Sequence, residues 1–146
     1  MKAFSIQHSV FRLMLMALVG IALFSCKNEP AYYVSDLQAY WQENNTQHFI
    51  RFTGEAANRT GYMWGYEWNA KEYTEDDLFD PTMYHGDGWF EYQMEKKGDL
   101  HEIHKMSNGG ADIPKEYVIS RLTTSALEYY ESGNKKNKYY FTKIKK

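Results

Sequence analysis

From residue 37 onward, apolar and polar positions alternate along short runs, and turn-forming residues separate the runs. A period of two places successive side chains on opposite faces of a strand, whereas a helix repeats every three or four residues. The breaks contain Asn, Gly, Ser or Asp, which favour the tight backbone of turns. The pattern therefore predicts eight strands, at 38–43, 47–53, 61–69, 88–95, 99–106, 115–122, 125–131 and 138–144.

Most connections between these runs are short, which favours antiparallel neighbours. Eight such strands can close on themselves in an up-and-down barrel that leaves no edge exposed. We therefore predict an all-β domain, an eight-stranded antiparallel barrel, over residues 37–146, with a two-sheet sandwich as the alternative. The acidic segment 71–86 interrupts the pattern and predicts a long loop, and loops of this length are often functional.

The first 25 residues have a different character. Lys2 and Arg12 accompany an unbroken apolar run, 13–24, which is shorter than the ~20 residues of a membrane-spanning helix. A short apolar run after a basic start is typical of a secretory signal peptide. It ends in Leu23-Phe24-Ser25-Cys26, which resembles the bacterial lipobox. That resemblance implies cleavage before Cys26, diacylglycerol on its thiol and an acyl chain such as palmitate on the new amino group.

These observations predict a lipoprotein signal peptide at 1–25, a lipidated tether at 26–36 and the barrel at 37–146. Cys26 is the single cysteine, so no disulfide partner competes for it. A plain secretory signal or a short membrane anchor is the alternative. Lys27 is not the aspartate that retains lipoproteins in the inner membrane of enteric bacteria, so the resemblance implies the outer membrane of the cell envelope. The net charge of −2 argues against a nucleic-acid partner.

The order of several motifs is similar to lipocalin-like domains of Bacteroidetes lipoproteins. The resembling stretches are Leu37-Gln38-Ala39-Tyr40-Trp41, Phe49-Ile50-Arg51-Phe52-Thr53, Gly61 to Trp68, Gly86 to Phe90, Ile113 to Ile119 and Tyr140-Phe141-Thr142-Lys143. The resemblance implies a calycin-type barrel and, for most members, no assigned activity. Two features depart from the broader lipocalin pattern: the first strand has Ala39 where a glycine is usual, and Lys143 stands where an arginine would pack on Trp41.

The third predicted strand carries large aromatic residues on one face. Alternation places Tyr62, Trp64, Tyr66 and Trp68 together, and we expect Phe90 and Tyr92 of the next strand to face the same barrel interior. These six residues are the candidate ligand-binding residues, because stacked rings could hold a sugar or an apolar ligand. The alternative is that they fill the barrel, since eight strands enclose a space just wide enough for side chains.

The segment His101-Glu102-Ile103-His104 does not match a zinc-protease helix, which needs two histidines four residues apart. On a strand, the two histidines point to opposite faces, while Glu102 and His104 share a face and predict a structural pair. No nucleophile elbow, phosphate loop or dinucleotide fingerprint is present. We therefore predict no catalytic residue, no metal site and no cofactor.

The sequence thus predicts a membrane-anchored, non-enzymatic lipoprotein with a lipocalin-like barrel. Its partners would be the membrane, through lipid on Cys26, and a small apolar or aromatic-stacking ligand. The alternative is a protein- or glycan-interaction module of an envelope complex, which would bind another envelope protein through the long loop and the barrel rim.

Overall fold

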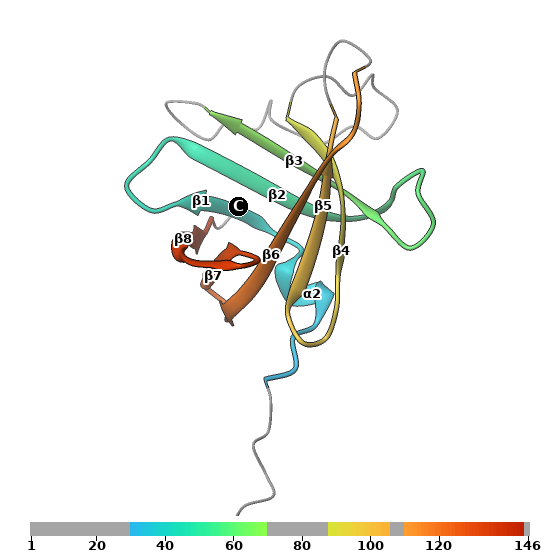
Figure 1. Ribbon diagram of the computed structural model, residues 1–146. Coiled ribbons are helices and arrows are strands. Elements are labelled where there is room, and N and C mark those ends of the chain that lie inside the picture. Colours follow the sequence, from blue (N-terminus) through green and yellow to red (C-terminus); the bar gives the residue numbers. More distant parts are fainter. Residues whose placement is uncertain (1–29, 70–87, 106–109, 145–146) are drawn as a thin grey trace, which may run out of the picture. The chain divides into compact units, whose positions relative to one another are not determined.

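The computed structural model describes residues 30–69, 88–105 and 110–144. A short helix, α2 (Val34–Leu37), precedes eight strands (Figure 1). The strands are β1 (Tyr40–Glu43), β2 (His48–Ala56), β3 (Met63–Asn69), β4 (Trp89–Met94), β5 (Asp99–His104), β6 (Ile113–Leu122), β7 (Ala126–Glu131) and β8 (Asn134–Lys143). All eight predicted strands are present, with ends that shift by a few residues. No helix in this part of the chain is long and apolar enough to cross a membrane.

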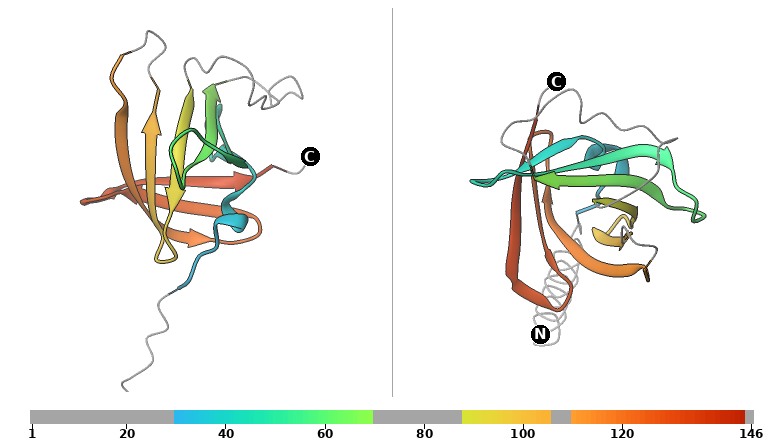
Figure 2. Two further views of the ribbon diagram at one scale, coloured as in Figure 1. Left: turned by 90° about the vertical axis from the view of Figure 1, so that its right-hand side faces the viewer. Right: turned by 90° about the horizontal axis from the view of Figure 1, so that it is seen from above.

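The strands form a closed antiparallel barrel in which each pairs with its neighbour in sequence. The ring closes where β8 pairs with β1, with Trp41 opposite Lys143. Seen from above, the strands surround a common interior (Figure 2). Irregular register in the β2–β3, β6–β7 and β7–β8 pairs bends the strands as a small barrel requires. The predicted up-and-down barrel is therefore confirmed, and the sandwich alternative is wrong.

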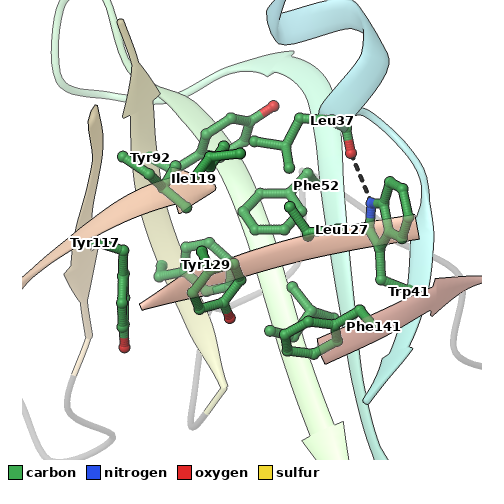
Figure 3. Packing of buried hydrophobic residues seen from close by; sticks show 12 residues of the cluster. Leu37, Trp41, Phe52, Tyr92, Tyr117, Ile119, Leu127, Tyr129 and Phe141 are labelled. Carbon is green, nitrogen blue, oxygen red and sulfur yellow. Dashed lines mark hydrogen bonds between the residues drawn. The ribbon is translucent and has the colours of Figure 1, made fainter. Parts of the chain in front are cut away.

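Apolar side chains from α2 and from the strands meet in the interior (Figure 3), and β3 contributes the partly buried Met63. Three aromatic residues, Trp41, Phe90 and Tyr92, have no exposed surface. The buried cluster consists of Leu37, Trp41, Ile50, Phe52, Phe90, Tyr92, Leu100, Tyr117, Ile119, Leu127, Tyr129 and Phe141. Since burial of a large apolar side chain contributes about 1.5–3 kcal/mol, this cluster is the main stabilising feature of a barrel in which no described residue forms a disulfide.

Helix α2 closes one end of the barrel. Trp41 Nε1 donates a hydrogen bond of 2.8 Å to the carbonyl oxygen of Leu37, which fixes α2 over the core. Lys143 Nζ lies 5.7 Å from the centre of the Trp41 ring, within the range of a cation–π contact. Lys143 therefore packs on Trp41, where the lipocalin pattern usually has an arginine.

The predicted tether is too long at its carboxyl end. Tyr32 packs against the core, and its amide donates to the carbonyl of Lys96 at 2.9 Å. Gly98, in the β4–β5 turn, has φ +97°, and a Cβ there would lie 2.9 Å from the Tyr32 ring. Residues 32–36, assigned to the tether, therefore belong to the folded domain, because an aromatic side chain anchors them.

Candidate functional site

The two ends of the barrel interior differ in chemistry. The end beside α2 is occupied by apolar side chains that are each at most 2% exposed: Leu37, Trp41, Phe52, Leu100 and Leu127. The opposite end carries charged groups and tyrosines, and the hydroxyl groups of Tyr117 and Tyr129 point away from α2 (Figure 3). We call this second region the polar end of the barrel, and its residues are described below.

Alternating carboxylates and imidazoles link four strands of the barrel at the polar end, and a lysine adds a fifth strand. His48, at the start of β2, contacts Glu43 through Nδ1 at 3.1 Å and Glu67 through Nε2 at 3.3 Å. The second oxygen of Glu67 lies 3.3 Å from His104 Nδ1, and His104 Nε2 lies 2.8 Å from Glu102 Oε2. The chain Glu43–His48–Glu67–His104–Glu102, together with Lys115 at 3.9 Å from Glu67, forms the polar network.

Glu67 is the centre of this network because it accepts from both imidazoles. Burial opposes its ionisation, but the hydrogen bonds from His104 and His48 outweigh that effect and lower the pKa of Glu67. The hydrogen bond to Glu67 in turn raises the pKa of His48, against the smaller opposing effect of burial. Near neutral pH, the bridge therefore favours an ionised Glu67 between imidazoles that hold their protons more tightly.

Glu102 and His104 form a buried pair at the inner end of the network. The imidazole stacks on Phe90, with ring centres 4.9 Å apart, so it joins the polar network to the apolar core. Burial tends to lower the pKa of His104, but the hydrogen bonds to Glu102 and Glu67 outweigh it and raise that pKa. Burial also raises the pKa of Glu102, whose side chain is 3% exposed. Its Oε1 receives no hydrogen bond from the described residues.

Three tyrosines form a wall beside these charges. The ring centres of Tyr117 and Tyr129 are 4.9 Å apart, and Tyr139 lies 5.4 Å from Tyr129 and 6.1 Å from Tyr117. Tyr139 donates to Glu131 Oε1 at 3.0 Å. A pocket of about 430 Å³ opens at this wall; among its lining residues are Lys115, Tyr117, Glu131 and Tyr139. The pocket therefore combines aromatic faces with both signs of charge.

The second hollow at the polar end has a volume of about 350 Å³. Its walls include His48, Glu67 and the edge of β3 at Trp68 and Asn69. Because Glu67 also contacts Lys115, which lines the tyrosine pocket, one carboxylate lies between the two hollows.

The prediction that the β3 aromatic residues share the barrel interior with Phe90 and Tyr92 is wrong. In the β3–β4 pair, Gly65 lies opposite Phe90, and Met63 lies opposite Tyr92. Directly opposed residues lie on the same face of a sheet, so the glycine and the methionine of β3 face inward. A Cβ on Gly65 would lie 2.3 Å from the Phe90 ring, which explains the glycine. Only Phe90 and Tyr92, of the six candidate residues, belong to the interior cluster.

The other four candidate residues, three on β3 and Tyr62 just before it, pack along the outer wall instead. Tyr66 stacks on Trp68 with ring centres 5.4 Å apart, and Trp68 stacks on Phe49 at the same separation. Trp64, which meets Trp89 edge to face, is only 4% exposed. Tyr62 lies at the β2–β3 connection, where Arg59 covers its ring at 5.6 Å. None of these four rings lines the tyrosine pocket, but Tyr66 and Trp68 line the second hollow, beside His48 and Glu67.

The predicted faces of the two histidines and the contact between Glu102 and His104 are confirmed. His101 points outward and pairs with Glu116 and Glu95, whereas His104 points inward and pairs with Glu102. Among the described residues, no group of three or more His, Cys, Asp or Glu side chains could hold a metal ion.

Sequence reasoning missed most of the polar end, including His48, Glu67, Lys115, Tyr117 and Tyr139. One usable signal was present: Glu67 lies two residues after Gly65 on the same face of β3. A glycine inside a strand is typical of a close approach by a large side chain, and a Gly65 that faces such a ring places Glu67 on the inward face as well. Cys26 and the predicted 71–86 loop lie outside the described residues.

No family model, curated protein or solved structure matches the chain.

Proposed function

We propose that this chain is a lipid-anchored, non-enzymatic binding protein of the bacterial cell envelope, whose lipocalin-like barrel holds a small ligand at its polar end. The observation that supports this most directly is the tyrosine pocket, which places aromatic faces and charged groups inside the rim of a closed barrel. Ligand sites commonly combine apolar walls with a few polar groups that fix orientation.

The filled half of the interior limits the kind of ligand. Phe52, Leu100 and Leu127 are at most 1% exposed, so a long fatty acid or a sterol would have to displace packed core side chains. The ligand that fits best is a small molecule with one aromatic face and polar groups. The apolar ligand suggested by the sequence is therefore the less favoured of the two types.

Ligand binding at the tyrosine pocket should raise the melting temperature of the purified chain, because a ligand that binds only the folded state stabilises it by mass action. The measurement is a thermal-shift screen of fatty acids, sterols, haem, sugars and small charged or neutral aromatic compounds. We expect shifts from small aromatic compounds and none from fatty acids or sterols.

The variant Tyr139→Leu removes one wall of the pocket and should abolish these shifts. Tyr140→Leu is the matched control, because Tyr140 is the next residue on β8 and is 47% exposed. If no compound shifts the melting temperature, or if both variants lose the shifts equally, a ligand site at the polar end is contradicted.

The lipid anchor is tested separately at Cys26. The chain, expressed in a diderm host with a labelled fatty acid, should carry the label and sediment with the outer membrane. Cys26→Ala should lose the label and leave the membrane fraction, because the thiol is the attachment atom. A Cys26→Ala variant that keeps both label and membrane association would refute the lipoprotein assignment.

A further inference from the structure

We infer that the barrel docks on the bilayer with its α2 end, so that Tyr33 lies in the headgroup region and the polar end opens toward water. This inference rests on the proposed lipid anchor at Cys26 and goes beyond it, because it assigns the face of the folded domain that contacts the membrane. Three features support it: the length of the tether, the place where the tether joins the barrel, and the side chains that are exposed there.

The chain between the proposed lipid and the barrel is short. Tyr32 is held by the fold, because its amide donates to the carbonyl of Lys96 and its ring lies against Gly98. Tyr32 is the sixth residue after Cys26. Since an extended chain spans at most about 3.3–3.6 Å per residue, Tyr32 can lie no more than about 20–22 Å from the lipidated residue. The lipid therefore keeps this part of the barrel close to the bilayer.

The tether joins the barrel at the end that α2 closes. Residues 31–33 leave the barrel beside α2 and the β4–β5 turn (Figure 1, Figure 2). Strand β5 runs from this turn, at Asp99, to His104 of the polar network, which is a length of about 17 Å at 3.3–3.4 Å per residue. With the polar end against the bilayer, the tether would have to span this separation and would lose most of its conformational freedom. The α2 end can face the bilayer without that cost.

An exposed aromatic side chain lies where the tether meets the barrel. Tyr33 directly follows the anchored Tyr32 and is 60% exposed, more than Tyr140 at 47% or Ile113 at 44%. Tyrosine is enriched at membrane–water interfaces, because its ring is apolar while its hydroxyl stays hydrated. A short flexible linker also gives an effective concentration in the millimolar range, so a weak contact is enough to keep the tethered surface on the bilayer.

The charges at this end of the barrel balance one another. On α2, in the β4–β5 turn and at the strand ends of this side, the basic residues are Lys96, Lys97, Arg121 and Lys143, and the acidic residues are Asp36, Glu55, Glu95 and Asp99. A polybasic surface would bind anionic lipid, whereas this surface has equal numbers of both signs. Docking should therefore depend on the tether and on Tyr33, and it should not require anionic headgroups.

The orientation is tested with the acylated protein, expressed from the full chain and reconstituted into phosphatidylcholine vesicles that contain headgroup nitroxide lipid. Lys97→Cys and Lys135→Cys each carry a fluorophore on the introduced thiol, while the thiol of Cys26 is blocked by its lipid. Both lysines are exposed, and Lys135 follows the β7–β8 turn, where Ser132 lines the tyrosine pocket. We expect at least about threefold stronger quenching at residue 97, because the two probes lie at opposite ends of the strands.

The role of Tyr33 is tested in the same vesicles. Tyr33→Asp should lower the quenching at residue 97 by about twofold or more, because an ionised side chain is excluded from the membrane. Tyr140→Asp is the matched control, since it makes the same change on the outer wall of β8 and should leave the quenching unchanged. Equal parts of phosphatidylglycerol and phosphatidylcholine should give the same quenching as phosphatidylcholine alone. Quenching that requires phosphatidylglycerol, or that both aspartate variants lower equally, would overturn the contact at Tyr33.

Failure of the orientation and failure of the lipid anchor give different results. If the purified protein carries no acyl group, the proposed anchor is wrong and the docked orientation is wrong with it. If the protein is acylated but the probe at residue 135 is quenched as strongly as the probe at residue 97, the orientation is overturned while the anchor stands. If the acylated protein is on the vesicles and neither probe is quenched, the barrel does not dock, and the inference is overturned as well.

Discussion

Replacing Trp41 by alanine is expected to lower the free energy of unfolding by about 3–5 kcal/mol, the cost of removing a large aromatic side chain from a packed interior. The Trp41 side chain is fully buried in the core cluster. Its indole donates the hydrogen bond that holds α2 through Leu37, and Lys143 covers its ring. The variant therefore loses core packing and also frees the helix that closes this end of the barrel.

Denaturant melts of the wild type and of Trp41→Ala measure this loss directly. Tyr33→Ala is the control, because Tyr33 is an aromatic residue of the same region that is 60% exposed, and its replacement should leave the stability nearly unchanged. Trp41→Phe should fall between the two, since it keeps a ring in the core but loses the hydrogen bond to Leu37. A loss below about 1 kcal/mol for Trp41→Ala would contradict the closed, packed end described above.

Replacing Glu67 by glutamine should cost roughly 2–3 kcal/mol near pH 5–6, somewhat less than breaking a fully buried ion pair, because the Glu67 side chain is 27% exposed. Its carboxylate accepts from His48 and His104 at the same time. A glutamine has one acceptor oxygen and no charge, so it can replace neither ion pair and only one of the two hydrogen bonds.

The pH dependence of the stability lost in Glu67→Gln follows from the carboxylate of Glu67 and from the imidazoles of His48 and His104. The pKa of Glu67 is lowered by the fold, so its contribution is present above its ordinary value of 4.5 and declines as the pH falls below that value. The pKa values of His48 and His104 are raised, so their contribution is present below the ordinary value of 6.5 and is lost as the pH rises through the folded values. Both conditions hold together between about pH 5 and 6.

The difference in unfolding free energy between the wild type and Glu67→Gln should therefore peak in that window and shrink toward both acid and alkaline pH. Chemical denaturation at a series of pH values measures the profile. Glu128→Gln is the control, because Glu128 pairs with Lys138 outside the polar network. A difference that is flat across the series would show that Glu67 does not bridge protonated imidazoles.

Much of the fold follows from local pattern. Period-two alternation and turn residues predict all eight strands, and their short connections predict an antiparallel meander that closes. The faces of His101 and His104 also follow from the strand period, because residues three apart on a strand must point to opposite sides. The place of Trp41 at one end of the interior follows from its position in the first strand.

The inward face of β3 does not follow from the same pattern. Alternation groups Tyr62, Trp64, Tyr66 and Trp68 on one face, but both faces of β3 carry residues that become buried, so local hydrophobicity cannot choose between them. The choice is made by the β3–β4 register, which places Gly65 opposite Phe90. Because a shift by one residue would turn every side chain of β3 to the other face, this single pairing decides where the three large rings of β3 lie.

The polar network is likewise a product of the closed barrel. Its members come from β1, β2, β3, β5 and β6, and Glu43 and Lys115 lie far apart in the chain. Each of these polar residues, taken alone, is an ordinary polar position on a half-exposed strand. They become a connected site because ring closure brings the inward positions of distant strands to one end, where the bridging distances of Glu67 to His48 and His104 are set by strand register and barrel curvature.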